Sequence, residues 1–349
     1  MDRSASVKLT DIAKRCNVSA ATVSLVLSDN PRISSETKGR VLKTIQKLRY
    51  YPNIYARALS TSVTKTFCVV VPQISHIFTE HYFGEVLSGI YDSASKDGYK
   101  ILLEVATYEF CFYKRYLQRF REKMIDGMFY VGSTLKDTYL ADFENVNFPF
   151  LQVGSYIPGL DVGYVISDNV RGGYLATRHL FELGHRKVGF ITGHFNVVSA
   201  RDRYEGYKKA LKEFQIPFER ELIARGNFNE ESGFEAMSVL LKKNRRNTRP
   251  KDRITAVFAS NDIMARGAIR AVESFGLRVP RDVSVVGMDN TKPSSVGDVK
   301  LTTVDYKIYE MGSMACRKMK EFIKAKDAST RIREILPVEL IVGDTTRRV

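Results

Sequence analysis

Residues 5–60 read ASVKLTDIAKRCNVSAATVSLVLSDNPRISSETKGRVLKTIQKLRYYPNIYARALS. Three short helical patterns follow one another here, and Cys16-Asn17-Val18 and Asp29-Asn30-Pro31 separate them. Asparagine is one of the few residues other than glycine that tolerate a left-handed turn, and proline cannot continue a helix. Two short helices around a tight turn, with a third packed behind, are the helix-turn-helix arrangement. The alternative is another kind of small three-helix domain.

Each helical pattern begins at a side chain that can cap it. We expect Thr10 to cap the first helix and Ser19 the second, because hydroxyl oxygens accept the first free backbone N–H groups. Ser34 or Ser35 begins the third. Apolar residues at helical spacing then give each helix an inner face. These are Ile12 and Ala13 in the first helix, Val23, Val26 and Leu27 in the second, and Val41, Leu42, Ile45 and Leu48 in the third.

Positive charge is concentrated in this part of the chain. Residues 1–62 contain 11 Lys+Arg and 4 Asp+Glu, a net charge of +7, whereas the whole 349-residue chain carries +15. A concentrated basic surface is typical of proteins that bind phosphates and release the counterions around them. Charge and helical pattern together favour a DNA-binding domain over a generic three-helix domain.

The stretch resembles the LacI/GalR family of bacterial transcription regulators. The resemblance rests on residues 9–60 of the quoted stretch, followed by TKTFCVVVP at 64–72, and weaker ordered matches continue to the C-terminus. It implies an N-terminal all-α helix-turn-helix domain with a hinge helix (1–62) and a periplasmic-binding-protein-like α/β core (67–349). That core would consist of two doubly wound parallel-sheet subdomains. The implied partners are a near-palindromic double-stranded DNA operator, a second copy of the chain and a small-molecule effector, often a carbohydrate.

The resemblance assigns the second helix to the major groove as the recognition helix. Ala20, Ala21 and Leu25 match base-contacting positions, and Thr22 and Ser24 match positions of phosphate or local polar contacts. Leu25 departs from the family, in which many members have Arg; Leu can only make apolar contact, for example with a thymine methyl. The residues expected to contact DNA are Thr10, Ser19, Ala20, Ala21, Thr22, Ser24, Leu25, Asn30, Tyr55, Ala56, Arg57 and Leu59.

Residues 53–59 match the family's hinge helix. Asn53 can cap this helix after Pro52, but so short a helix is marginal alone in water, so we expect it to form only when two copies pack together on DNA. In the family, the residue that matches Leu59 inserts between base steps in the minor groove and kinks the duplex. An ordinary amphipathic linker helix is the alternative. The polar run Ser60–Thr66 is then the expected linker between domains.

Short β-branched runs alternate with helical patterns over the rest of the chain, which predicts parallel sheets with helices on both faces. The resemblance adds that the chain crosses between two subdomains near residues 162, 290 and 327. The expected strands are Phe67–Val71, Ile101–Val105, Gly127–Val131, Phe150–Val153, Tyr164–Ser167, Val188–Thr192, Ala256–Ala259, Ser284–Gly287 and Val338–Val342. The expected helices are Gly84–Lys96, Val170–Leu183, Arg203–Phe214, Glu230–Lys243 and Asp262–Phe275.

Polar residues follow several of these strands, where open α/β sheets bind their ligands. By resemblance Arg203, Asn261 and Asp289 hold the effector, and Ser199 matches such a position less firmly. Charged groups that form bidentate hydrogen bonds suit neighbouring hydroxyls. Structural roles compete with this hypothesis, since Asp262 can cap a helix and Asp289 can satisfy a turn.

The segment ISHIFTEHYF at 74–83 is about four residues longer than its family counterpart and is expected to rim the cleft. Phe78 and Tyr82 join the expected effector-binding set, and His76 is a further candidate. These side chains could stack on a sugar or a purine or pack in the core, whereas Phe83 favours the core. Asp168 stays open between a helix cap and a ligand contact.

Catalytic signatures are absent: the sequence lacks GxSxG, HExxH, GxxxxGK[ST] and GxGxxG. His179 and His185 are expected to be structural, and the four Cys, without CxxC spacing, favour buried thiols in a reducing cytoplasm over disulfides or zinc. We therefore expect no enzyme activity, no metal and no cofactor. Without an N-terminal apolar run or a stretch of 18 apolar residues, we expect neither a signal peptide nor a membrane span.

Two classes of protein remain: a ligand-responsive DNA-binding regulator, with repression the expected outcome, and a solute-binding protein without a DNA function. The basic N-terminal domain and the absent signal peptide favour a cytoplasmic regulator. The basic run KKNRRNTRPKDR at 242–253 favours a solvated loop over a second nucleic-acid contact. Since VGDTTRRV follows the last expected strand without a heptad segment, a homodimer is favoured over a tail-built tetramer.

Overall fold

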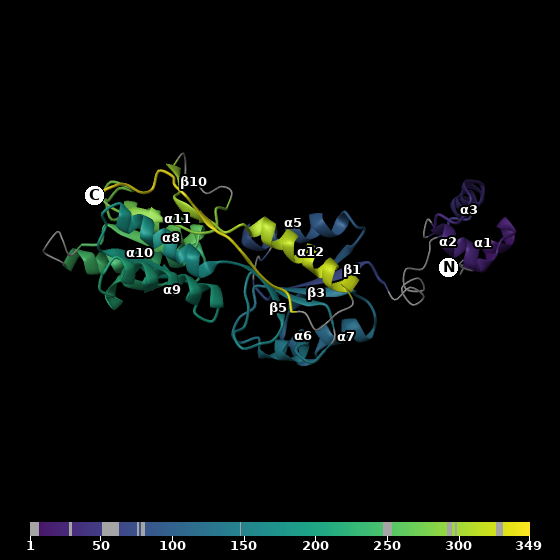
Figure 1. Cartoon of the computed structure of the whole chain (residues 1–349). Helices are drawn as coiled ribbons and strands as arrows, with labels where there is room; N and C mark the ends of the chain where they lie inside the picture. Colours follow the sequence, from purple (N-terminus) through teal and green to yellow (C-terminus); the bar gives the residue numbers. More distant parts are fainter. Residues whose placement is uncertain are drawn as a thin grey trace, which may run out of the picture. The chain divides into compact units, whose positions relative to one another are not determined.

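The structure is a computed structural model that describes residues 7–27, 30–50, 63–74, 77, 81–146, 148–246, 253–291, 295–296, 299–325 and 331–349. The chain divides into two compact units, Met1–Thr64 and Lys65–Val349 (Figure 1). The boundary between them falls inside the polar run expected to be the linker. Within the described ranges, none of the helices has the length and apolar character needed to cross a membrane.

The first unit consists of α1 (Leu9–Cys16), α2 (Ala20–Leu27) and α3 (Ser35–Lys47). Asn17 adopts the left-handed conformation, with φ 49° and ψ 50°, that the turn after α1 requires. Ile12, Val23 and Val41 are fully buried in one small core, which fixes the three helices to one another. The predicted helix-turn-helix arrangement is therefore confirmed.

The helix caps agree with the sequence at two positions out of three. The Oγ atoms of Ser19 and Ser34 accept hydrogen bonds from the backbone N–H groups three residues later, at 3.0 and 3.3 Å. The prediction for Thr10 was wrong, because α1 begins at Leu9 and the Lys8 N–H is bound by the Asp11 carboxylate at 2.8 Å. Leu42, expected on the inner face of α3, is 51% exposed. Its neighbour Val41 takes the inner position, and successive helical side chains point about 100° apart.

A six-stranded parallel sheet forms the first subdomain of the second unit, in the order β13-β5-β4-β3-β1-β2. One of its faces is covered by α5 (His81–Ser95) and α12 (Ile308–Ala325), and the other by α6 (Tyr108–Phe112) and α7 (Arg115–Arg121) (Figure 1). The strands are β1 (Thr66–Pro72), β2 (Lys100–Ala106), β3 (Gly127–Val131), β4 (Phe150–Val153), β5 (Gly163–Ser167) and β13 (Arg333–Leu336). A 3₁₀ helix, η2 (Thr138–Phe143), follows β3.

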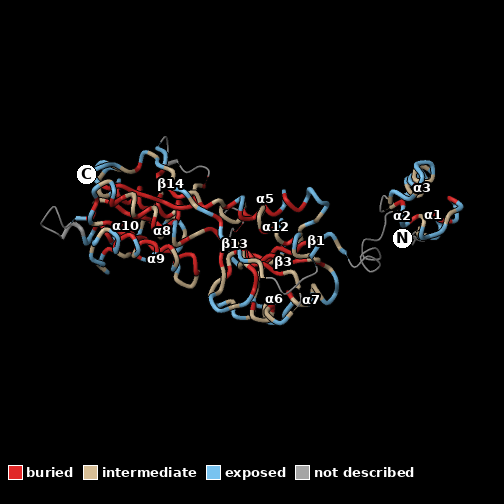
Figure 2. Tube along the Cα trace, in the orientation of Figure 1, coloured by how far each residue is buried: buried red, intermediate tan, exposed pale blue. Residues whose placement is uncertain are grey.

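A four-stranded parallel sheet, in the order β7-β6-β8-β9, forms the second subdomain. Phe190 and Phe258 pack toward α8 (Asn169–Glu182) and α9 (Val198–Glu213), whereas alternate residues pack toward α10 (Glu230–Arg246) and α11 (Asp262–Ser274). Figure 2 shows buried residues along the strands and exposed ones on the outer sides of the helices. The strands are β6 (Val188–Thr192), β7 (Ile223–Arg225), β8 (Ala256–Ala259) and β9 (Ser284–Val286), and η3 (Arg220–Leu222) precedes β7.

The chain passes three times between the two subdomains. It leaves the first sheet after β5, returns between β12 (Thr303–Asp305) and α12, and leaves again between β13 and β14 (Glu339–Ile341), which pairs with β12. Each passage lies downstream of the expected positions 162, 290 and 327; residue 327 itself is outside the described residues. Strand–helix alternation carries no signal of which sheet a strand joins, so these positions could not be read from periodicity.

All nine expected strands and all five expected helices of the second unit are present within a few residues of their predicted bounds. The elements missed are the short strands β7, β12 and β13, the helices α6, α7 and α12, the 3₁₀ helices η2 and η3, and the small hairpin of β10 (Ser295–Val296) and β11 (Val299–Lys300). The missed strands have two to four residues. Strands as short as these were predicted only where they lie in mostly apolar runs, whereas β7, β12 and β13 each contain a charged residue.

Candidate functional site

Arg203 lies on α9 where the two subdomains meet, and it is 4% exposed. Its Nε donates to Asn169 Oδ1 at 3.0 Å, and its Nη1 donates to the Ser260 carbonyl. The guanidinium carbon lies 4.8 Å from the centre of the Tyr306 ring, in a cation–π contact. Its Nη2 is 3.5 Å from Asp289 Oδ1. These contacts hold the guanidinium in one orientation.

Asp289 follows β9, and its backbone has a φ of 131°. This conformation is unusual for a residue with a side chain and costs about 1–3 kcal/mol. Its N–H donates to the Val304 carbonyl at 2.9 Å, but its Oδ1 is buried and accepts no hydrogen bond from the described residues. Burial raises the pKa of Asp289, Arg203 lowers it and the nearby Asp262 carboxyl raises it further. Asp289 is therefore held by its backbone with an acceptor unused.

The cap of α11 is Asn261 and not Asp262. Asn261 is the N-cap of α11, because its Oδ1 accepts from the Met264 N–H at 2.9 Å, and its Nδ2 donates to the Phe228 carbonyl at 3.0 Å. The predicted cap role of Asp262 was wrong: its carboxylate accepts from the Thr303 hydroxyl at 2.5 Å and the Thr291 N–H at 3.0 Å. Burial raises the pKa of Asp262. These two bonds leave one N–H group and one oxygen lone pair of the Asn261 amide for a ligand.

Tyr82 brings the first subdomain to this site. It is half-buried at the start of α5, and a Cβ added at Gly154 (φ 76°) would lie 1.7 Å from the Tyr82 hydroxyl oxygen. The Tyr306 hydroxyl also donates to the Gly154 carbonyl, at 3.4 Å. Burial, followed by the fields of Tyr306 and Asp289, raises the pKa of Tyr82. Phe83 packs against the core as expected, whereas His76 and Phe78 lie outside the described residues.

Three buried hydroxyls at strand ends have no hydrogen-bond partner among the described residues. Ser155 follows β4 of the first subdomain, Thr192 ends β6 and Ser260 follows β8. None of the three was expected from the sequence, although a small polar residue at or just after the end of a buried strand could have marked each of them. Ser199, which was expected here, is buried one helical turn before Arg203 and so lies on the same side of α9.

A second contact between the subdomains lies beside Arg203. Asp202 on α9 interacts with the hydroxyl of Tyr156, which follows β4. Burial raises the pKa of Asp202 to about 6, with Arg203 lowering it and Asp168 and Glu205 raising it. Asp168 itself caps α8, because its Oδ1 accepts from the Arg171 N–H at 2.8 Å. The structural alternative for Asp168 therefore has direct support.

His179 and His185 have structural partners. His179 contacts the Thr346 hydroxyl at 3.1 Å, and His185 is enclosed by the hydroxyls of Thr255 and Ser284 at 2.8 and 3.1 Å. Burial lowers the pKa of His185 to about 4, which keeps the ring neutral. The prediction that these histidines are structural is confirmed.

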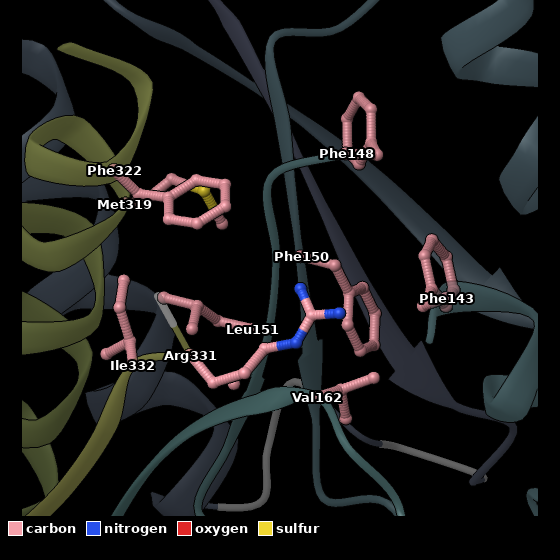
Figure 3. Close-up of a pocket in the computed structure, with 10 residues that line it drawn as sticks. Phe143, Phe148, Phe150, Leu151, Val162, Met319, Phe322, Arg331 and Ile332 are labelled. Carbon is pink, nitrogen blue, oxygen red and sulfur yellow. The ribbon is translucent and has the colours of Figure 1, made fainter. Parts of the chain in front are cut away.

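A small cavity lies at the opposite, amino ends of the strands in the first subdomain (Figure 3). Its volume of about 20 Å³ is close to that of one water molecule. The guanidinium of Arg331, which lies beside the Phe150 ring, donates to the Glu144 carbonyl at 3.0 Å. The lining residues are Phe143, Phe148, Phe150, Leu151, Val162, Gly163, Met319, Phe322, Arg331 and Ile332. This cavity is too small for a sugar-sized ligand.

The outward face of α2 carries the expected DNA-reading residues. Ala20, Ala21, Ser24 and Leu25 are exposed, opposite the buried face of α2. Thr10 and Ser19 are also exposed, whereas Thr22 is half-buried, as is Asn30, whose Oδ1 accepts from the Arg32 N–H. The hinge residues Tyr55, Ala56, Arg57 and Leu59 lie outside the described residues.

The comparison with known proteins agrees with both units. Residues 8–53 match the family described as bacterial regulatory proteins, lacI family, and residues 177–346 match the periplasmic binding protein-like domain. The chain is 33% identical over 344 residues to the HTH-type transcriptional repressor PurR of Mannheimia succiniciproducens, covering 98% of this chain and 99% of that protein. The chain belongs to the LacI family.

Other LacI-family relatives match over similar lengths. The HTH-type transcriptional regulator DegA of Bacillus subtilis is 31% identical and covers 96% of this chain and 97% of its own. Among solved structures, a Lac repressor dimer bound to operator and the anti-inducer ONPF is 26% identical, with a TM-score of 0.82 and coverage of 98% and 99%. A CelR–cellobiose complex is also 26% identical, with a TM-score of 0.73 and coverage of 97% and 99%.

Membership of the LacI family establishes the general function. The protein is a DNA-binding transcriptional regulator and not an enzyme. The expected fold, a helix-turn-helix domain followed by an α/β core with two parallel sheets, is confirmed. The geometry adds that Arg203 and Asp289 of the second subdomain face each other and lie close enough to Tyr82 of the first for their charges to act on its pKa.

Proposed function

We propose that this LacI-family regulator is a repressor whose affinity for its operator is switched by a small hydroxylated ligand, a sugar or sugar derivative, bound beside Arg203 and Asp289. The observation that carries the proposal is the unused Oδ1 of Asp289, buried 3.5 Å from a guanidinium nitrogen. Buried polar groups without partners are rare in proteins, and a ligand that supplies the missing bonds accounts for one. Asn261 and Ser199 are the further expected ligand contacts beside Arg203 and Asp289.

The polar groups around the pair suit a polyol. A sugar hydroxyl both donates and accepts, so one hydroxyl can donate to Asp289 while its neighbour accepts from Arg203. The hydroxyls of Ser155, Thr192 and Ser260 offer further donors and acceptors at the carboxyl ends of both sheets. Solved structures similar to this chain support this class, since a CelR complex contains cellobiose and a LacI family regulator of Enterococcus faecium contains ribose.

The switch acts through the two subdomains. A ligand that contacts Tyr82 on one side and Arg203 on the other stabilises one angle between the subdomains. In the homodimer that we propose, this angle sets the spacing of the two hinge segments, 53–59, and so the fit of two recognition helices in adjacent major grooves. Coupling of this kind is reciprocal: the factor by which ligand changes DNA affinity is the factor by which DNA changes ligand affinity. Such a repressor works in the cytoplasm, where its operator is.

Thermal unfolding in the presence of sugars, sugar phosphates and purines tests the ligand class. A ligand at 100 times its Kd stabilises the folded protein by about 2.7 kcal/mol. The Ser155→Ala and Ser260→Ala variants should lose part of this stabilisation while keeping the stability of the free protein. Thr303→Val is the matched control, because the Thr303 hydroxyl is already bound to Asp262. Its loss should lower the stability of the free protein and leave the stabilisation by ligand unchanged.

Gel mobility shift with DNA from the protein's own upstream region separates the regulator from the alternative, a solute-binding protein without a DNA function. A complex whose affinity changes with the ligand found by thermal unfolding supports the proposal. Ligand binding with unchanged DNA affinity would refute the switch but leave the DNA-binding function intact.

A further inference from the structure

Three aromatic side chains outside the core lie together on α6 and directly after it, on one face of the first sheet (Figure 1). Tyr108, Phe112 and Tyr113 are 72%, 63% and 65% exposed, whereas Phe110 between them is buried and supplies the core contact of this helix. The ring centres of Tyr108 and Phe112 are 5.5 Å apart and stacked, and Phe112 meets Tyr113 edge-to-face at 5.1 Å. The rings therefore form one continuous apolar patch, and such patches mark interaction sites.

An open groove with a volume of about 450 Å³ adjoins this patch, and Tyr113 belongs to both. Its walls come from Tyr113, from α7 with its N-cap and from η2. The volume is within the range of pockets that bind small ligands, so a large side chain of a partner can enter. We call the patch and the groove together the α6–α7 surface. The groove is lined by Tyr113, Lys114, Leu117, Gln118, Arg121 and Asp142.

Positive charge accompanies the α6–α7 surface. Residues 108–123 contain five Lys+Arg and two Asp+Glu, a net charge of +3. Two of these cations, Lys114 and Arg119, pair with carboxylates at 2.9 and 2.6 Å. The other three are exposed and form no ion pair with a described residue: Arg115, Arg121 and Lys123. Unpaired positive charge therefore lies along the same segment as the apolar patch.

This composition favours one kind of occupant. A second copy of the chain would bring the same positive charge to the contact, and like charges oppose association. Single-stranded nucleic acid stacks its bases on free ring faces, whereas Tyr108 and Phe112 cover one face of each other and Phe112 meets Tyr113 edge-on. An acidic protein segment satisfies both the charge and the groove. Aromatic residues and arginine are also the types that dominate binding at protein interfaces.

We propose that the α6–α7 surface docks an acidic segment of a partner protein that carries large apolar side chains. An apolar side chain of that segment occupies the groove against Tyr113 and Leu117, and its carboxylates pair with Arg115 and Arg121. The α6–α7 surface shares no residue with α2 or with the site around Arg203. The proposal therefore does not depend on the effector.

A labelled peptide with two Phe residues in a run of Glu is the probe. Its fluorescence anisotropy is followed while the full-length protein is added at constant ionic strength. The same peptide with Lys in place of Glu tests the charge, and one with Ala in place of Phe tests the apolar anchor. We expect the Phe–Glu peptide to bind about tenfold more tightly than either of the others, as an interface hot spot requires.

Substitutions on the protein locate the binding. The double variant Phe112→Ser/Tyr113→Ser and the single variant Arg121→Glu should each weaken binding of the Phe–Glu peptide about tenfold. All three side chains are exposed, so both variants should fold, and thermal unfolding checks this. Phe218→Ser and Lys212→Glu are the matched controls, because both residues are exposed in the second subdomain, and they should leave the affinity unchanged.

Equal affinity of wild type and both surface variants for the Phe–Glu peptide would overturn the proposal, as would equally tight binding of the Lys peptide. A uridine oligonucleotide that binds more tightly than the peptide, and loses affinity in the same variants, would assign the surface to single-stranded nucleic acid instead. An oligomer seen by sedimentation that is lost only in the double variant would make a second copy the occupant. Failure of the effector switch would leave all these comparisons intact.

Discussion

Arg203 Nη2 and Asp289 Oδ1 face each other 3.5 Å apart in the interior, farther than a strong charge-assisted hydrogen bond. Arg203 is fixed by Asn169, Ser260 and Tyr306, and Asp289 is fixed by its strained backbone. In the structure neither side chain closes this gap. The gap leaves one acceptor and part of a guanidinium for a ligand that bonds to both.

Removing Arg203 should lower the stability of the protein more than removing Asp289. Arg203→Met leaves Asp289 and the Ser260 carbonyl unpaired, so we expect a loss of about 3 kcal/mol in the free energy of unfolding. Asp289→Asn should cost less than half as much, because its Oδ1 has no hydrogen bond to lose. Urea denaturation monitored by circular dichroism measures both changes.

The exposed ion pair of Arg178 and Glu182 provides the control for that experiment. These side chains are 38% and 48% exposed, and exposed pairs contribute little, so Arg178→Met should change stability by less than about 1 kcal/mol. Equal losses for Arg203→Met and Asp289→Asn would show that the two residues act as an ordinary closed salt bridge.

Gly154 should be required for the position of Tyr82. In Gly154→Ala the new Cβ would meet the Tyr82 hydroxyl, so the tyrosine must move, and we expect ligand affinity to fall at least tenfold. Gly159 has a similar left-handed φ of 85° but no atom within 4 Å of the added Cβ. Gly159→Ala should therefore show only the backbone cost of about 1–2 kcal/mol, with unchanged ligand affinity. Thermal unfolding with and without ligand separates the two effects, and equal ligand affinity in both variants would exclude this role of Gly154.

The sequence predicts which residues belong to the site better than it predicts what each of them bonds to. Arg203 and Asp289 could be named because each follows a strand at a position that the family uses. The roles of Asn261 and Asp262 could not be predicted in this way, since both residues can cap α11. Only the hydrogen bonds of Thr303 and Thr291 to Asp262 decide between them. Local sequence contains no information about such contacts, which join residues up to 41 positions apart.

The same limit explains the errors in the helices and strands. Leu42 and Val41 are adjacent apolar residues, and both fit an amphipathic pattern, so only the contacts of α3 with α1 and α2 choose Val41 for the core. The position of β13 in the first sheet depends on its pairing with β5, about 170 residues earlier in the chain. Periodicity predicted the strands of four or more residues between residues 67 and 300. It could not predict that the chain returns to the first sheet at β13.

Asp202 should make stability depend on pH. Its pKa of about 6 in the folded protein lies above the ordinary value of 3.8, so the unfolded chain releases this proton first as pH rises. Stability should therefore fall between about pH 4 and pH 6 and level off above that range. In Asp202→Asn this part of the fall should disappear when unfolding by urea is measured at a series of pH values.

The Tyr156→Phe variant tests the cause of that pH dependence. The Tyr156 hydroxyl lowers the pKa of Asp202, so its removal should raise this pKa and extend the fall in stability above pH 6. An unchanged pH profile in Tyr156→Phe would show that the contact between Asp202 and Tyr156 does not form in solution.

Removing the caps of α2 and α3 in turn separates the effect of a cap on stability from its effect on DNA binding. Ser19→Ala and Ser34→Ala each remove one side-chain cap, and each should destabilise the first unit by about 1 kcal/mol. Only Ser19 begins the helix assigned to the major groove, so Ser19→Ala alone should weaken operator binding, by about tenfold. Fluorescence anisotropy with labelled operator DNA measures the affinity. Equal weakening in both variants would attribute the effect to stability alone.

Leu25 should determine base preference at one position of each half-site. It is 38% exposed on the outward face of α2, and its apolar side chain can contact a thymine methyl but cannot bond to guanine in the bidentate way of arginine. Leu25→Arg should therefore shift the preferred base at that position to guanine, with a discrimination of about 1–3 kcal/mol. Selection of binding sites from a random DNA pool reads the preference directly.

Leu42→Arg is the matched control, because Leu42 is also exposed but lies on α3. The added charge should tighten binding to all sequences without changing the preferred base. Identical selected sites for wild type and Leu25→Arg would remove Leu25 from the set of base-reading residues.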